Sequence, residues 1–486
     1  MGQKDPRSLL ARLQDHHREG YLSLHMPGHK ENTGLAPYLS DLNAELDITE
    51  LPGFDDLHAP KEILADAMKR AAQVWGSTRS WLQVNGSSGA LLAAIRGITR
   101  RGDKILVARH CHKSIYHAIE LCGLEPVFLL PPAEEAFGLS GSISPEQVEK
   151  ALEEHPDARL IVYPSPTYDG VLSDTAGICA IAHEKGIPVL VDEAHGAHLG
   201  LWQVFPPSAM DQGADLAVAS LHKMLPSLTQ TAVLHGRDRH VNLIEVNRQT
   251  GIFQSSSPSY LLMASMEGCI RLLEEEGEPL LRQWKAQLED FDRQVAGLKH
   301  LRLPGHGKEA GETYPNIFGL DPAKIVISTR WSALSGVELM TRLREDYKIE
   351  LEMALENHAV AMTGLGTDDD FAGRLATALL ELDEKFGPNT EEPEPLEAIT
   401  AIPPRKMTLE AAAMAPGGVD FLYDSMGKVC GEYIWAYPPG IPLITPGEVI
   451  TVDLIWYVER LFQAGVKLVG TQGKPPFTTV WVGEGT

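Results

Sequence analysis

The chain has 486 residues, a formal net charge of -24 and a hydrophobic fraction of 43%, which is typical of a soluble globular protein with two or three domains. The acidic balance disfavours nucleic acid as a partner, because phosphate binding needs clustered Lys and Arg. The five cysteines have no C-x-x-C spacing, which disfavours a disulfide framework or a zinc site. No apolar run reaches the ~18 residues of a membrane span and no signal-peptide core is present, so we expect a cytoplasmic protein without a membrane partner.

The N-terminal segment is predicted to be a polar helix followed by a turn. Residues 1–20 form the helix, and Pro27-Gly28 marks a turn between His25 and His29. Two histidines beside a turn could bind a metal, but no further ligands follow them, so we predict no metal site. An ordinary N-terminal loop is the alternative explanation of this motif.

The next segment combines a strand, a small-residue turn and a helix. After a helix at 61–75, a strand at 81–84 runs into Asn85-Gly86-Ser87-Ser88-Gly89, and a helix follows at 90–98. Small residues, hydroxyl groups and a helix N-terminus together can bind phosphate. A simple strand–turn–helix corner with a capping serine is the alternative.

From residue 104 onward, strands and helices alternate. The predicted strands are 104–109, 125–130, 159–164, 187–198 (which ends in acid and histidine) and 216–219, and the helices are 114–122, 145–154 and 175–185. This alternation predicts an α/β fold with a mainly parallel sheet and helices on both faces. Polar residues stand where strands end, the place where open α/β sheets bind ligands. These residues are Ser87, His112, Thr167, Asp192, His195 and Lys223.

The second half of the chain is less regular. Residues 236–300 are predicted to be mainly helical, and 323–330 and 348–353 to be strands of a smaller domain. The acidic, Pro-rich stretch 391–404 is predicted to be a linker or surface loop, and 431–448 to be dominated by loops.

The strand-end residues together describe a pyridoxal-phosphate site. Taken alone, Lys223 could be a solvated amine that closes a strand. A lysine can also form a Schiff base with an aldehyde cofactor, whose phosphate Gly86-Ser87-Ser88 would bind. Asp192 is placed to pair with a protonated pyridine nitrogen, and His112 could stack on the ring.

The order of the motifs resembles the Orn/Lys/Arg decarboxylases, bacterial basic amino-acid decarboxylases with the aspartate-aminotransferase fold (PLP fold type I). The matching motifs are HMPGHK (25–30), NGSSGA (85–90), HCHKS (110–114), PTYDG (166–170), VDEAHGAH (191–198), SLHKMLPSLTQTA (220–232), SSSPSY (255–260) and YPPGIPLITPGE (437–448). Because the first motif begins at His25, the resemblance implies the short form without a leading receiver-like domain. Pro226 departs from the small residue of many members, and 361–402 matches weakly.

The resemblance also implies a role for each matching residue. Lys223 would be the Schiff-base lysine, Asp192 the partner of the ring nitrogen, His112 the stacking group, and His195 a neighbour of the ring or substrate. Further cofactor contacts would come from Gly86, Ser87, Ser88, Thr167, Ser220 and His222. Ser255 or Ser256 would reach the phosphate of a neighbouring subunit, which implies a homodimer or higher oligomer with a shared site. Substrate contacts would come from Glu432, Glu448 and His25; a solvated loop acid is the alternative for each glutamate, and an interface loop for His25.

The implied activity is decarboxylation of lysine, arginine or ornithine to cadaverine, agmatine or putrescine, which are polyamines or their precursors. Another reaction on this fold (an aminotransferase or side-chain lyase) and a catalytically silent regulatory homologue are the alternatives. The implied domains are an N-terminal segment at the dimer interface (1–60), a large PLP-binding domain (61–300), a small α/β domain (301–395) and a C-terminal domain (396–486). The sequence does not choose among the three substrates.

Overall fold

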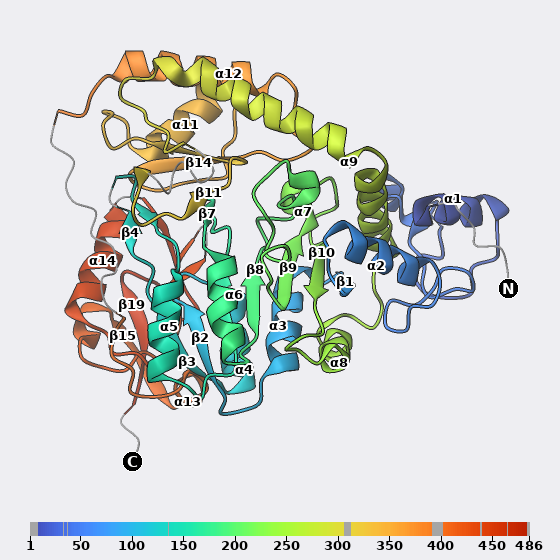
Figure 1. Cartoon of the computed structure of the whole chain (residues 1–486), viewed down its shortest axis with the longest axis horizontal. Coiled ribbons are helices and arrows are strands. Elements are labelled where there is room, and N and C mark those ends of the chain that lie inside the picture. The colour runs from blue at the N-terminus through green and yellow to red at the C-terminus, as the bar shows by residue number, and fades with distance from the viewer. Residues whose placement is uncertain are drawn as a thin grey trace. The chain divides into compact units, whose positions relative to one another are not determined.

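The computed structural model describes residues 8–32, 34–35, 37–134, 136–305, 313–390, 402–437, 440–463 and 465–483. The chain folds into two compact units, and each unit combines two separate stretches (Figure 1). Unit 1 consists of Met1–Ile98 and Glu193–Arg282, and unit 2 of Thr99–Asp192 and Gln283–Thr486. The predicted boundaries near residues 60, 300 and 395 stay a prediction.

Unit 1 contains three strands that pair in the antiparallel order β1-β10-β9. The strands are β1 (Arg79–Gln83), β9 (Leu216–Ser220) and β10 (Ala232–Gly236). Every residue of β9 and β10 is buried, which accounts for their mainly apolar sequences. The helices are α1 (Leu9–Glu19), α2 (Ile63–Val74), α3 (Gly86–Ile98), α7 (Leu221–Met224), α8 (Leu243–Phe253) and the start of α9 (Tyr260–Gln294).

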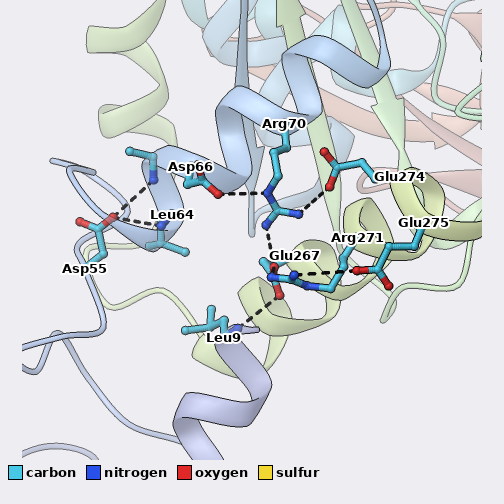
Figure 2. A network of polar contacts seen from close by, with 10 residues as sticks. Leu9, Asp55, Leu64, Asp66, Arg70, Glu267, Arg271, Glu274 and Glu275 are labelled. Carbon is cyan, nitrogen blue, oxygen red and sulfur yellow. Dashed lines mark hydrogen bonds and ion pairs between the residues drawn. The ribbon is translucent and has the colours of Figure 1, made fainter. Parts of the chain in front are cut away.

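A network of ion pairs holds three helices of unit 1 together (Figure 2). Asp55 caps α2 by accepting hydrogen bonds from backbone amides, including that of Leu64 at 3.0 Å. Glu267 of α9 accepts hydrogen bonds from Arg70 of α2 at 2.6 Å and from the Leu9 amide at the start of α1 at 3.2 Å. The buried carboxylate of Glu267 therefore joins α1, α2 and α9.

Unit 2 contains a parallel sheet in the order β8-β6-β2-β3. Its strands are β2 (Lys104–Ala108), β3 (Glu125–Leu129), β6 (Ile161–Pro164) and β8 (Val189–Asp192), and the intervening helices are α4 (Lys113–Cys122), α5 (Pro145–Glu154) and α6 (Thr175–Glu184). The α5 helix has the predicted bounds because Ser144 and Gln147 form a capping box beside Pro145. The predicted α/β fold with a mainly parallel sheet is confirmed.

The rest of unit 2 forms smaller sheets covered by helices. One has the order β12-β14-β13 and another the order β17-β16-β18, and the described residues also form three pairs of strands. The strands of the two larger sheets are β12 (Lys324–Ser328), β13 (Met353–Ala354), β14 (His358–Met362), β16 (Ile434–Tyr437), β17 (Ile441–Ile444) and β18 (Lys467–Gly470). The pairs are β4 (Ala133–Glu134) with β5 (Leu139–Ser140), β7 (Val171–Leu172) with β11 (Gly319–Leu320), and β15 (Gly417–Phe421) with β19 (Thr478–Val482). The helices are α11 (Gly336–Tyr347), α12 (Phe371–Phe386), α13 (Leu409–Met414) and α14 (Val452–Gln463).

Several local predictions needed correction. The strand at 348–353 is wrong, because Lys348 ends α11 with a left-handed backbone and only Met353–Ala354 is extended. The strand β10 was not predicted; it follows α7 after a connection too short for a helical crossover, so it pairs antiparallel with β9. Most of the predicted linker 391–404 lies outside the described residues. Within the described chain, no helix combines the length and apolar character needed to cross a membrane.

Candidate active site

Lys223 lies one turn beyond the end of the buried strand β9, in the short helix α7. Its Nζ is 2.9 Å from Nε2 of His195, which belongs to the turn of residues 193–199 and is 8% exposed. The structure therefore brings together two of the predicted site residues. An amine and an imidazole at this distance share a proton, so His195 can accept or return one at Lys223 Nζ.

The residues beside Lys223 differ in their hydrogen bonding. Ser220 is fully buried, and its Oγ has no hydrogen-bond partner among the described residues. Burial lowers the pKa of His222, and its Nδ1 lies 2.9 Å from the Thr231 carbonyl. Because a carbonyl only accepts, Nδ1 of His222 carries a proton and donates it to Thr231. Ser220 thus retains a free hydroxyl group where the motif predicts a cofactor contact.

The predicted phosphate loop forms the first turn of α3 in unit 1. Gly86 has a left-handed backbone with φ 69°, which allows the sharp turn from the strand into the helix. In the part of the chain that the structure describes, the amides of Gly86, Ser87 and Ser88 donate to no protein acceptor, as is usual in the first turn of a helix. The Ser255 amide donates to Asn85 Oδ1 at 3.3 Å, so SSSPSY lies beside this loop.

The remaining predicted cofactor residues belong to unit 2. Asp192 ends β8, is 5% exposed, and pairs with Pro164 of β6. Burial raises the pKa of the Cys111 thiol, and the nearby carboxylate of Asp192 raises it further, so Asp192 lies close to the HCHKS motif. The His112 ring caps α4, with Nδ1 2.8 Å from the Ser114 hydroxyl. Thr167 Oγ1 is hydrogen-bonded within its own turn, to the amide of residue 171.

The side chains of the two glutamates predicted to contact substrate are buried and bind other residues of the chain. Glu432 and Glu448 are 1% and 0% exposed, so the solvated-loop explanation is wrong. Glu432 accepts four hydrogen bonds from donors of segment 472–480. Glu448 forms a bidentate pair with Arg109 at 2.7 and 2.9 Å and also contacts Arg405 at 3.4 Å. Because the chain itself occupies both carboxylates, this geometry argues against a substrate contact by either.

Sequence reasoning missed a cavity of about 230 Å³ that lies wholly within unit 2. His110 and Asp169 are among its lining residues, and both stand inside motifs quoted for the resemblance. Burial lowers the pKa of His110 to about 4, and neither ring nitrogen has a partner in the described chain. The polar residues of HCHKS and PTYDG were the available signal, but only the fold shows which of them line a cavity.

The comparisons with known proteins agree with the motif pattern. Residues 8–303 match the family model described as the major domain of Orn/Lys/Arg decarboxylases. Proteins named arginine decarboxylase from Bacillus anthracis and Bacillus subtilis are each 33% identical, over 96% and 95% of this chain and 94% of each relative.

Solved structures share the fold. A lysine decarboxylase from Francisella novicida has a TM-score of 0.84 at 20% identity, over 98% of this chain and 81% of that one. An alanine–glyoxylate aminotransferase from Nostoc sp. has a TM-score of 0.56 at 17% identity, over 71% of this chain and 91% of that one. The motifs, the match of the family model and the full-length relatives together establish that the chain belongs to the Orn/Lys/Arg decarboxylase family.

Proposed function

We infer that this chain is a pyridoxal-phosphate-dependent decarboxylase of a basic amino acid. The observation that carries the inference is the 2.9 Å contact between Lys223 Nζ and His195 Nε2 at the end of a buried strand. This pair stands in a chain whose full-length relatives carry the name arginine decarboxylase. The bound cofactor supplies an electron sink for the charge that remains on the α-carbon when carbon dioxide leaves.

The residues present fit this cofactor. Ser220 has a buried hydroxyl group without a partner among the described residues, and a phosphate oxygen would satisfy it. The unpaired amides of residues 86–88 stand at the N-terminus of a 13-residue helix, where the helix dipole favours an anion. Asp192 is a buried carboxylate that would stabilise a protonated ring nitrogen.

Each residue has a defined task in this proposal. Lys223 holds the cofactor through its amine, and His195 accepts and returns the proton at Nζ. Asp192 would keep the ring nitrogen protonated, and His112, which contacts Ser114, would stack on the ring. Arginine is the substrate to test first, because the relatives at 33% identity carry its name.

The test is a product assay with arginine, lysine and ornithine, in which agmatine, cadaverine, putrescine and carbon dioxide are measured. We expect carbon dioxide and one amine in equal amounts. Lys223→Ala should abolish both products and the visible absorption of the bound cofactor, whereas Lys185→Ala, an exposed lysine at the end of α6, should change neither. Full turnover by Lys223→Ala would contradict the assignment, and an oxo-acid product would indicate an aminotransferase.

We further propose a homodimer or higher oligomer in a reducing compartment such as the cytoplasm. Ser255 and Ser256 are exposed in the single chain, as a contact with a neighbouring subunit requires. All five cysteines are buried and none of them forms a disulfide, which suits a reducing environment. Light scattering at the assay concentration tests the assembly: a monomer with full activity would rule out a shared site.

A further inference from the structure

We propose that His16, His25 and Glu31 of unit 1 form a binding site for a divalent transition-metal ion, and that Zn²⁺ is the ion it prefers. One ligand atom from each of the three residues lies within 4.8 Å of the other two. A tetrahedral zinc ion with bonds of about 2.1 Å separates its ligand atoms by about 3.4 Å. Ligand atoms that approach one another by at most about 1.4 Å would therefore reach the spacing required around an ion.

The local fold brings the three residues together from an 11-residue helix and the loop after it. His16 lies in the last turn of α1, and Gly20 ends that helix with a left-handed backbone (φ 68°). The chain then reverses, so that segment 21–31 returns alongside the helix. Glu31 also has a left-handed backbone, with φ 58°, which directs its side chain back to α1, where its Oε2 lies 3.3 Å from His17 Nδ1.

Both histidines present a nitrogen that suits a metal. Nε2 of His16 is buried and has no hydrogen-bond partner in the described chain, although its ring stacks on Tyr21 at 5.0 Å. A buried nitrogen without a partner costs about 1–3 kcal/mol, and a metal bond would remove that cost. Nδ1 of His25 contacts the Met26 carbonyl at 2.5 Å, so the proton is on Nδ1 and Nε2 offers its lone pair. The Ser23 hydroxyl, 3.3 Å away, is the present donor to that lone pair.

The surroundings leave room for a fourth ligand. A cavity of about 520 Å³ is lined by His16 and His25, and also by the charged residues Arg12, Asp15 and Glu19. Two imidazoles, one carboxylate and an open position form a ligand set that zinc commonly uses. The contact of His17 with Glu31 corresponds to the outer hydrogen bonds that orient metal ligands.

The proposal departs from the sequence prediction of no metal site. That prediction considered only His25 and His29 as a pair, but the structure directs His29 to Asp47, with Nε2 3.5 Å from Oδ2. The residues that lie beside His25 are His16 and Glu31, not His29. A bound ion would cross-link α1 to the HMPGHK loop, independently of the chemistry at Lys223.

The test uses the whole, cofactor-loaded chain, which is stripped with EDTA, dialysed free of EDTA, reloaded with Zn²⁺ and dialysed again. We expect one tightly bound Zn²⁺ per chain by elemental analysis, and a Co²⁺ derivative whose visible absorption Zn²⁺ abolishes. Glu31→Gln and His16→Gln should each weaken Zn²⁺ binding at least tenfold, whereas His155→Gln, at the end of α5, should leave it within twofold.

Two results would overturn the proposal. One is a wild-type chain that binds no Zn²⁺ at micromolar concentration. The other is a double variant, His16→Gln with Glu31→Gln, that binds as much Zn²⁺ as the wild type with the same affinity. Circular dichroism of each variant establishes that it is folded, so that lost binding reports on the ligands.

Discussion

Replacing Glu267 with Gln should destabilise the protein far more than the same replacement at Glu278 in the same helix. Each glutamate accepts a hydrogen bond at 2.7 Å from the arginine four residues later, Arg271 or Arg282. The two pairs differ in exposure, because the Glu267 side chain is 0% exposed and the Glu278 side chain 47%. Glu267 also accepts at 2.6 Å from Arg70 of α2, as Figure 2 shows.

The expected magnitudes follow from this difference in burial. An exposed pair four residues apart contributes about 0.3–0.5 kcal/mol, which is the most that Glu278→Gln can cost. Removing one partner of a buried ion pair costs about 3–5 kcal/mol. We expect about 3 kcal/mol for Glu267→Gln, because Arg70 is 15% exposed and keeps its contact with Glu274 at 2.8 Å.

Urea unfolding at neutral pH, followed by circular dichroism at low salt and at 1 M NaCl, measures both free energies. The effect of Glu278→Gln should vanish at high salt, where the Debye length is about 3 Å, whereas that of Glu267→Gln should persist. If the unfolding free energies of the two variants differ by less than about 1 kcal/mol, the buried carboxylate of Glu267 does not hold the three helices together.

Two further predictions concern catalysis and pH. Asp192→Asn should keep the cofactor but slow the release of carbon dioxide in a single turnover by a factor of ~10²–10³, because an amide does not hold a ring nitrogen protonated. A rate within a few-fold of the wild type would exclude this role for Asp192. Burial lowers the pKa of His110 to about 4 and of His235 to about 3, whereas both titrate near 6.5 when unfolded. Between those values only the unfolded chain takes up the protons, so stability should fall as the pH decreases below 6.5, by on the order of 1 kcal/mol per pH unit for each ring. Urea midpoints at pH 7.5 and 5.5 measure this loss, which should be smaller in His235→Leu; the same midpoints at both pH values would contradict it.

Much of the fold could be predicted because the signals that specify it are local. The bounds of α5 follow from Ser144, Pro145 and Gln147, three neighbours that cap one helix. The buried strands are short apolar runs, and Lys223 could be found because it directly follows such a run. The order of the motifs then indicated the family, and the family implied the cofactor.

Contacts between distant segments required the tertiary structure. Glu448 pairs with Arg109 across 339 positions, and nothing near either residue in the sequence marks them as a buried pair. The antiparallel pairing of β10 with β9 depends on which strand edges come together in the fold. The cluster of His16, His25 and Glu31 depends on how the chain turns after α1. The sequence by itself determined most of the elements and the residues able to do the chemistry, because capping and apolar patterns act over a few positions. Only the tertiary structure decided which charges are buried and paired, because that depends on segments far apart in the chain.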